Sequence, residues 1–253
     1  IIESEKIKSG AKIFPVDSEH SAIWQCLAGE KIDQVEKIIL TGSGGPFRNR
    51  DIDTLIDVKV SDALNHPNWE MGKKITIDSA SMMNKGLEVI ETKWLFGIDW
   101  DKIEIVIHPE SIIHSMVEFK DKSVKAQMGV PDMKVPIQYA LTYPDRKVAD
   151  WESLDLSKIG SLNFEPPSFK RFPCISLAYE TLKKGGSYPA VLNVANEQAV
   201  YRFLNNEISF IDIPIIIEKA CAKHEYIKQP SLDELIYIET WTINFVKSFE
   251  GKN

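Results

Sequence analysis

The sequence has few cysteines and no long apolar run. Its 253 residues include 3 cysteines, Cys26, Cys174 and Cys221, which stand far apart without any Cys-x-x-Cys pair. Neither a disulfide framework nor a structural zinc site is indicated, so a reducing compartment is expected. No stretch approaches the roughly 20 apolar residues that cross a bilayer, so we expect no membrane partner.

An excess of basic charge is also missing. The 30 basic residues are outnumbered by 37 acidic ones, and the resulting net charge of -7 disfavours a general nucleic-acid surface. The first residues carry charges where a signal peptide would have its apolar core, and they are typical of a chain entered partway through a helix. With 43% hydrophobic and 26% charged residues, the composition is that of a globular protein.

Short apolar runs alternate with amphipathic segments in the first part of the chain, which is typical of α/β layers. The pattern predicts strands at 12–16, 36–41, 74–78, 103–108, 113–119 and 124–128. It predicts helices at 18–28, 51–57, 80–96 and 133–142. Residues 119–124 separate two alternating runs and predict a hairpin, so the sheet should be mixed rather than purely parallel.

A change of composition predicts the domain organisation. Residues 143–172 are rich in Pro and charge and predict a linker. Beyond them, apolar residues recur near helical spacing in segments that begin at Cys174, Pro189, Ile211 and Ser231. We therefore expect an α/β (α+β) fold with a mixed-sheet domain over 1–142, the linker, and a small helical bundle over 173–253.

The first candidate site lies where an apolar segment runs into a helix at residues 14–20. Asp17 and Glu19 are two carboxylates that could converge on a hard cation such as Mg²⁺ or Mn²⁺, and Ser18 could contact a substrate hydroxyl. Alternatively, Asp17 or Ser18 caps the helix and Glu19 favours its positive end.

The second candidate is a glycine-rich loop after a predicted strand. Gly42 and Ser43 could bring N–H and hydroxyl donors close to a phosphate. The loop lacks the Gly-Lys-Ser/Thr of a P-loop, and Phe47 stands where a dinucleotide fingerprint needs its third glycine. A tight turn with positive φ explains the glycines equally well.

The third candidate, residues 66–72, has neither helical nor strand periodicity. Such a segment suits a lid in which Trp69 and Met71 close over a ligand while His66 contacts an anion. The alternative is that Trp69 anchors the core.

The fourth candidate is the segment 78–94. Asn84 and Lys85 share a helix face with Glu88, which could complete the oxygen shell begun by Asp17 and Glu19. Ser79, Asn84 and Lys85 could hold a phosphate at the positive end of the helix, although a solvated Lys–Glu pair is the simpler interpretation. Apolar residues at helical spacing predict a buried stripe of Met83, Leu87, Ile90 and Trp94. Structural roles are expected for the other polar residues, namely His108, His114, His224, Asn193, Asn196 and Glu197.

Taken together, these motifs resemble the 1-deoxy-D-xylulose-5-phosphate reductoisomerase family. The resemblance is carried by PVDSEH at 15–20, LTGSGGPF at 40–47, HPNW at 66–69 and DSASMMNKGLE at 78–88. It extends through IHPESIIHSM at 107–116, PDM at 131–133 and LNVANE at 192–197.

The resemblance implies an enzyme of non-mevalonate isoprenoid biosynthesis that converts 1-deoxy-D-xylulose 5-phosphate to 2-C-methyl-D-erythritol 4-phosphate, using NADPH and Mg²⁺ or Mn²⁺. It implies metal ligation by Asp17, Glu19 and Glu88, and catalytic roles for Glu19, Lys85 and His66. Substrate-binding roles are implied for Ser18, Gly42, Ser43, His66, Trp69, Ser79, Asn84, Lys85 and Glu88. Cofactor contacts are implied for Met71, Gly72 and Met133.

The family's N-terminal NADPH-binding domain has no counterpart before Asp17, so we expect the chain alone not to turn over. The resemblance also implies a homodimer that binds a phosphorylated sugar, in the bacterial cytoplasm or a plastid-type organelle. Two alternatives stay open: a non-catalytic truncated homologue acting as a dimeric binding module, and a cofactor-independent isomerase or aldolase.

Overall fold

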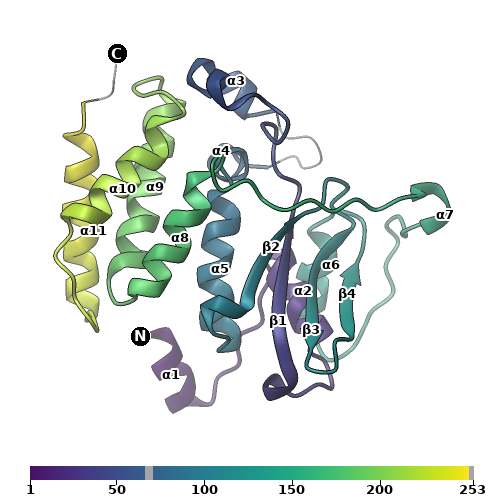
Figure 1. Cartoon of the computed structure of the whole chain (residues 1–253). Helices are drawn as coiled ribbons and strands as arrows, with labels where there is room; N and C mark the ends of the chain where they lie inside the picture. The colour runs from purple at the N-terminus through teal and green to yellow at the C-terminus, as the bar shows by residue number, and fades with distance from the viewer. Residues whose placement is uncertain (66–70, 251–253) are drawn as a thin grey trace. The chain divides into compact units, whose positions relative to one another are not determined.

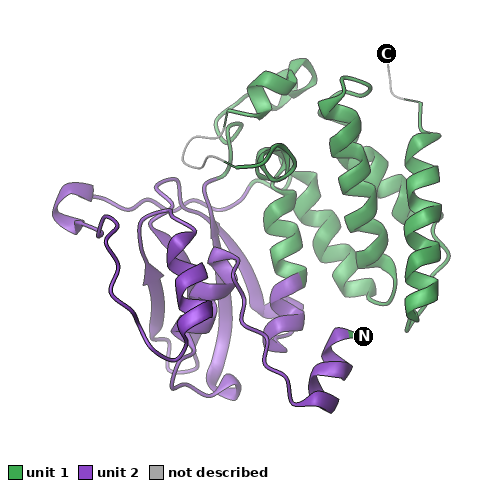
Figure 2. Cartoon of the chain, turned by 180° about the vertical axis from the view of Figure 1, so that it is seen from behind, with its two compact units in different colours: residues 1, 44–90, 168–253 green, residues 2–43, 91–167 purple. Residues whose placement is uncertain are grey.

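The structure, a computed structural model, describes residues 1–65 and 71–250 and divides into two compact units (Figure 2). Unit 1 comprises residues 1, 44–90 and 168–253, and unit 2 comprises residues 2–43 and 91–167. This division differs from the domains expected from the sequence, because residues 44–90 group with the C-terminal helices and most of the expected linker groups with the sheet.

Unit 2 is built on a four-stranded sheet with the order β2-β1-β3-β4 (Figure 1). Its strands are β1 (Val35–Gly42), β2 (Ile103–Ile107), β3 (Ile113–Phe119) and β4 (Val124–Met128). Strand β1 pairs in parallel with β2 and antiparallel with β3, and β3 pairs antiparallel with β4 across the predicted hairpin. The mixed α/β fold class is therefore confirmed.

Two helices of unit 2, α2 (Ser18–Cys26) and α6 (Lys134–Thr142), lie on one face of the sheet (Figures 1 and 2). Helix α2 contacts β1, β3 and β4 with its buried residues, and α6 packs on α2. The short elements are α1 (Ile2–Ser9), η1 (Ile32–Gln34), η3 (Trp100–Lys102) and α7 (Leu156–Ile159). The strand predicted at 12–16 is wrong, since these residues have no regular structure and Ile13, Phe14 and Val16 are exposed.

Unit 1 is helical, and α9 (Tyr188–Leu204) lies at its centre. This helix contacts α4 (Lys73–Ser81), α8 (Pro173–Lys184), α10 (Asp212–Lys223) and α11 (Leu232–Lys247). Its residues Leu192, Ala195 and Ala199 are fully buried, which confirms the expected helical bundle. The short elements η2 (Ile52–Asp57) and α3 (Val60–Ala63) precede α4.

The segment predicted as a strand at 74–78 is helical, so that prediction is wrong. Ile77 and Ala80 are fully buried, and the Thr76 hydroxyl donates to the Gly72 carbonyl at 2.9 Å within the helix. Met82 adopts a φ of 59° and separates α4 from α5 (Met83–Phe96). The helix predicted over 80–96 is therefore observed from Met83 onward, and its first two residues belong to the end of α4. Trp94 is 59% exposed and does not belong to the predicted buried stripe. Across the described residues, each helix is too short or too polar to cross a membrane.

Candidate active site

Asp17 is the N-cap of helix α2. Its Oδ1 accepts a hydrogen bond from the Glu19 backbone N–H at 3.1 Å, so the interpretation of Asp17 as a cap is confirmed. The Ser18 hydroxyl donates to Glu19 Oε2 at 2.7 Å. All three side chains are half-buried at the start of α2, so two carboxylates are held in defined orientations there.

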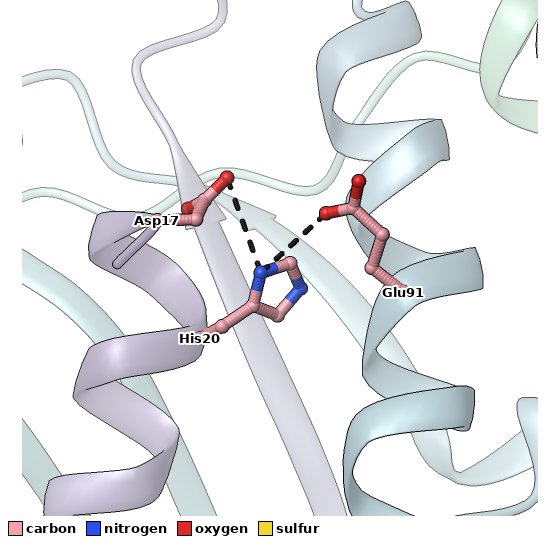
Figure 3. Close-up of side chains that lie close together, drawn as sticks. All are labelled: Asp17, His20 and Glu91. Carbon is pink, nitrogen blue, oxygen red and sulfur yellow. Dashed lines mark ion pairs between the residues drawn. The ribbon is translucent and has the colours of Figure 1, made fainter. Parts of the chain in front are cut away.

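His20 places a potential nitrogen ligand beside Asp17, and sequence reasoning missed it. Its buried ring places Nδ1 3.9 Å from Asp17 Oδ2 and 3.5 Å from Glu91 Oε2 (Figure 3). One potential metal-ligating atom from each of these three residues lies within 4.8 Å of the others. The three-residue spacing of Asp17 and His20 could have predicted that they lie together, because residues three apart share one side of a helix. No local pattern in the sequence indicated that Glu91 would join them.

The Asn84, Lys85 and Glu88 side chains meet on α5, as their helical spacing predicts. Asn84 Nδ2 donates to Glu88 Oε1, and Lys85 Nζ lies 2.7 Å from Glu88 Oε2. The Lys85 and Glu88 side chains are only 7% and 1% exposed, so the solvated surface pair is excluded. Removing one partner of a buried ion pair leaves the other charge buried without compensation, which lowers stability by about 3–5 kcal/mol. Lys85 and Glu88 therefore depend on each other to remain charged in this position.

The glycine loop after β1 approaches helix α4 closely. Gly44 and Gly45 have φ of 83° and 65°, which confirms the turn with positive φ. A Cβ on Gly45 would lie 2.5 Å from the Ser79 carbonyl oxygen, so only glycine allows this approach within unit 1. The loop thereby fixes the backbone at Ser79, one of the predicted phosphate ligands. Gly42 ends β1 and Ser43 follows it in unit 2.

A buried polar cluster joins α4 to α9. Lys74 Nζ lies 2.6 Å from Asp78 Oδ2, and Asn196 Nδ2 donates to Asp78 Oδ1 at 2.8 Å. Burial raises the pKa of Asp78, while Lys74 and Asn196 act in the opposite direction. The structural role expected for Asn196, either in a polar network or on an exposed face, is thus that of a buried network, and this network anchors the helix that carries Ser79.

The other predicted site residues are spread over both units. Met71 precedes α4 and is half-buried, and Gly72 is the N-cap of that helix. Met133, 37% exposed, is the N-cap of α6. His66 and Trp69 lie outside the described residues. The ligand roles of all these residues stay predictions.

The histidines that follow β2 and α10 have structural partners. His108 Nε2 accepts from the Ile112 backbone N–H at 3.1 Å, so Nδ1, 2.9 Å from the Asn163 carbonyl, is the donor in the neutral ring. His224 Nε2 lies 2.6 Å from the Ser187 hydroxyl. These contacts agree with the structural roles expected for both residues.

Two family models match the chain. One, described as the 1-deoxy-D-xylulose 5-phosphate reductoisomerase C-terminal domain, matches residues 13–96. The other, described as the DXP reductoisomerase C-terminal domain, matches residues 128–245. Between them they cover the beginning of α2, the glycine loop, α4, α5 and most of the helical bundle.

Similar proteins carry the same description. The chain is 60% identical to 1-deoxy-D-xylulose 5-phosphate reductoisomerase of Chloroherpeton thalassium, over 97% of the chain and 64% of that relative. It is 57% identical to the enzyme of the same description from Acetivibrio thermocellus, over 98% of the chain and 65% of the relative. The chain thus spans just under two thirds of the length of these relatives.

Solved structures of such enzymes have the same fold. The Zymomonas mobilis reductoisomerase in complex with NADPH has a TM-score of 0.90 and 44% identity, over 96% of this chain and 63% of that one. A DOX-P reductoisomerase in complex with NADPH, fosmidomycin and magnesium has a TM-score of 0.89 and 38% identity, over 95% of this chain and 64% of that one.

Proposed function

Because the chain belongs to the 1-deoxy-D-xylulose 5-phosphate reductoisomerase family, we propose that it forms the metal- and substrate-binding part of such an enzyme. The substrate would be 1-deoxy-D-xylulose 5-phosphate, rearranged and reduced to 2-C-methyl-D-erythritol 4-phosphate. The observation that carries the proposal is the buried Lys85–Glu88 pair with Asn84, since it gathers a cation, a carboxylate and an amide on one face of α5.

We assign the divalent metal to Asp17, Glu19 and Glu88. These residues supply only carboxylate oxygens, the donors that Mg²⁺ and Mn²⁺ prefer. The cap hydrogen bond orients Asp17, the Ser18 hydroxyl orients Glu19, and Asn84 and Lys85 orient Glu88. When bound, the metal supplies a Lewis acid for the neighbouring carbonyl and hydroxyl oxygens of the substrate.

We assign the substrate phosphate to Ser43, Ser79, Asn84 and Lys85, with Gly42 allowing close approach of the backbone. Lys85 would share its charge between Glu88 and the phosphate, and its burial strengthens both interactions. Ser18 would contact the hydroxyketone, with His66 and Trp69 nearby. Met71, Gly72 and Met133 would border NADPH, which supplies hydride to the rearranged aldehyde.

Calorimetry on the 253-residue chain tests the metal and inhibitor sites together. We expect fosmidomycin to bind measurably in the presence of Mn²⁺ and not in its absence. Asp17→Asn should weaken Mn²⁺ binding about tenfold or more while α2 stays capped, because Asn caps a helix as well as Asp does. Asp101→Asn, an exposed carboxylate of unit 2, is the matched control. Metal-independent inhibitor binding, or none at all, contradicts the proposal.

Two further variants distinguish the predicted ligands from the cluster in Figure 3. A metal held by Asp17, Glu19 and Glu88 is weakened by Glu19→Gln and retained in Glu91→Gln. A metal held by Asp17, His20 and Glu91 gives the opposite result. Equal loss in both variants would mean that neither set is correct as stated.

Turnover is a separate test of the chain alone. We expect the 253 residues to bind substrate without oxidising NADPH, because they correspond to only 64% of the length of the relative from Chloroherpeton thalassium. Measurable NADPH oxidation contradicts this expectation. Product formed without any NADPH oxidation would favour the cofactor-independent isomerase or aldolase.

A further inference from the structure

Unit 1 contains a cavity that the proposed reaction does not use. It has a volume of about 440 Å³, is bordered by α8, α10 and η2, and has apolar walls that include Leu177, Phe210 and Ile215. Small-molecule sites commonly fall between about 300 and 1,000 Å³. Ser81 lines this cavity. Because it lies two residues after Ser79 on the same helix, its side chain points roughly 200° around the helix axis from the Ser79 side chain. The cavity therefore faces the opposite side of α4 from the predicted phosphate ligand.

Charged side chains at the cavity are separated by sign. Lys170 and Arg171 line it just before α8, whose first turn has no side-chain cap and begins at Pro173. Glu180 and Glu218 line it two helical turns further, roughly 10 Å along α8 and α10. Helix α9 runs back along both α8 and α10, so α8 and α10 run in the same direction. Because Glu180 and Glu218 come in the second half of their helices, both carboxylates lie toward the same end of the cavity.

The cationic end also has hydrogen-bonding capacity. Arg171 Nη1 donates to the Arg48 carbonyl, which fixes the guanidinium in the wall. Arg171 Nε is buried and has no hydrogen-bond partner in the part of the chain that the structure describes. The guanidinium charge of Arg171 adds to the ammonium charge of Lys170 at this end, and a negatively charged group placed there is attracted to both.

We propose that this cavity binds a small amphipathic anion. Its carboxylate, sulfonate or phosphate group lies at Lys170, Arg171 and the first turn of α8, and its apolar body lies on Leu177, Phe210 and Ile215. The carboxylates of Glu180 and Glu218 exclude a second negative charge at the far end, so the ligand carries one anionic group.

Paired fluorescent probes test the proposal on the full chain. Anilinonaphthalene sulfonate has an apolar body with one anionic group, and phenylnaphthylamine has a similar body without charge. We expect the sulfonate to bind saturably and at least tenfold more tightly than the neutral probe. Lys170→Gln should weaken sulfonate binding about fivefold and leave the neutral probe unchanged. Lys228→Gln, an exposed lysine away from the cavity, is the matched control.

A cavity-filling variant tests the location. Ser176→Trp places a large ring in the cavity wall and should abolish sulfonate binding. If this variant does not fold, the Lys170→Gln comparison decides alone. Equal affinity for the two probes, sulfonate binding unaffected by Lys170→Gln, or displacement of the sulfonate by fosmidomycin with Mn²⁺ would each overturn the proposal. These outcomes are independent of whether the metal site is assigned correctly.

Discussion

Gly86 sets how closely α5 approaches α8, and its substitution gives a prediction with an internal control. A Cβ on Gly86 would lie 2.7 Å from the Ala178 Cβ, whereas nonbonded carbons prefer about 3.5–4.0 Å. Gly86→Ala must therefore displace one helix from the other. Because Asn84, Lys85 and Glu88 are on the same helix, this contact also sets where the predicted phosphate and metal ligands lie within unit 1.

Two opposing terms determine the size of the effect. Overpacking costs about 1–3 kcal/mol, and the higher helix propensity of alanine returns about 1 kcal/mol. Gly86→Ala should thus lower the free energy of unfolding by up to about 2 kcal/mol. Ala178→Gly alone loses roughly 2 kcal/mol through propensity and the buried methyl group. The double variant moves the methyl group from one helix to the other, so the clash disappears.

A double-mutant cycle from urea unfolding measures this rescue. We expect the double variant to be more stable than the sum of the single changes by about 1–3 kcal/mol. Gly86→Ala combined with Ala195→Gly, a fully buried alanine of α9, should be additive to within about 0.5 kcal/mol. Additivity in the Gly86–Ala178 cycle would refute the packing argument.

Three other outcomes follow from single residues. Gly45→Ala and Gly97→Ala each place an alanine at positive φ, which costs about 1–2 kcal/mol, but only the alanine at position 45 would also clash with the Ser79 carbonyl. Urea unfolding should therefore show a larger loss of unfolding free energy for Gly45→Ala, and equal losses would contradict the close approach. Burial raises the pKa of Asp78, so the unfolded carboxyl ionises first as pH rises. The stability of the protein relative to Asp78→Asn should therefore fall from about pH 3 towards pH 7 in urea unfolding, and a rising difference would contradict this sign. Burial raises the pKa of Cys174 to about 12, so a thiol reagent near pH 8 should label Cys174 slowly in the folded protein and quickly in denaturant. Rapid labelling of Cys174 in the folded protein would contradict its burial.

Local patterns predict most elements, because their signals lie within one turn or strand. The helix expected from Pro189 to Asn205 is observed as Tyr188–Leu204, and the strand expected at 36–41 as Val35–Gly42. The strand prediction for residues 74–78 fails because Ile75 and Ile77 alternate as they would in a strand, whereas in the structure α4 is a helix that buries Ile77 and Ala80 and contacts α9. That contact partner lies far along the chain and has no local signature.

The site divides in the same way. The i, i+3 and i, i+4 spacing of Lys85, Asn84 and Glu88 is a property of one helix, so it is predictable without the fold. Asp78 and Asn196 are separated by 118 residues and meet only through tertiary packing. The burial of the Lys85–Glu88 pair was not predictable in this way, because spacing alone does not distinguish a solvated ion pair from a buried one. In the structure the two side chains are 7% and 1% exposed.

The discontinuous make-up of unit 1 has a consequence during synthesis on the ribosome. Helix α4 contacts α9, and the Asp78–Asn196 hydrogen bond joins residues 118 positions apart. At translation rates of about 5–20 residues per second, α4 waits on the order of ten seconds for its partner. During that interval Asp78 has no Asn196 side chain to bond to, so the nascent α4 exists without a contact that it has in the folded chain.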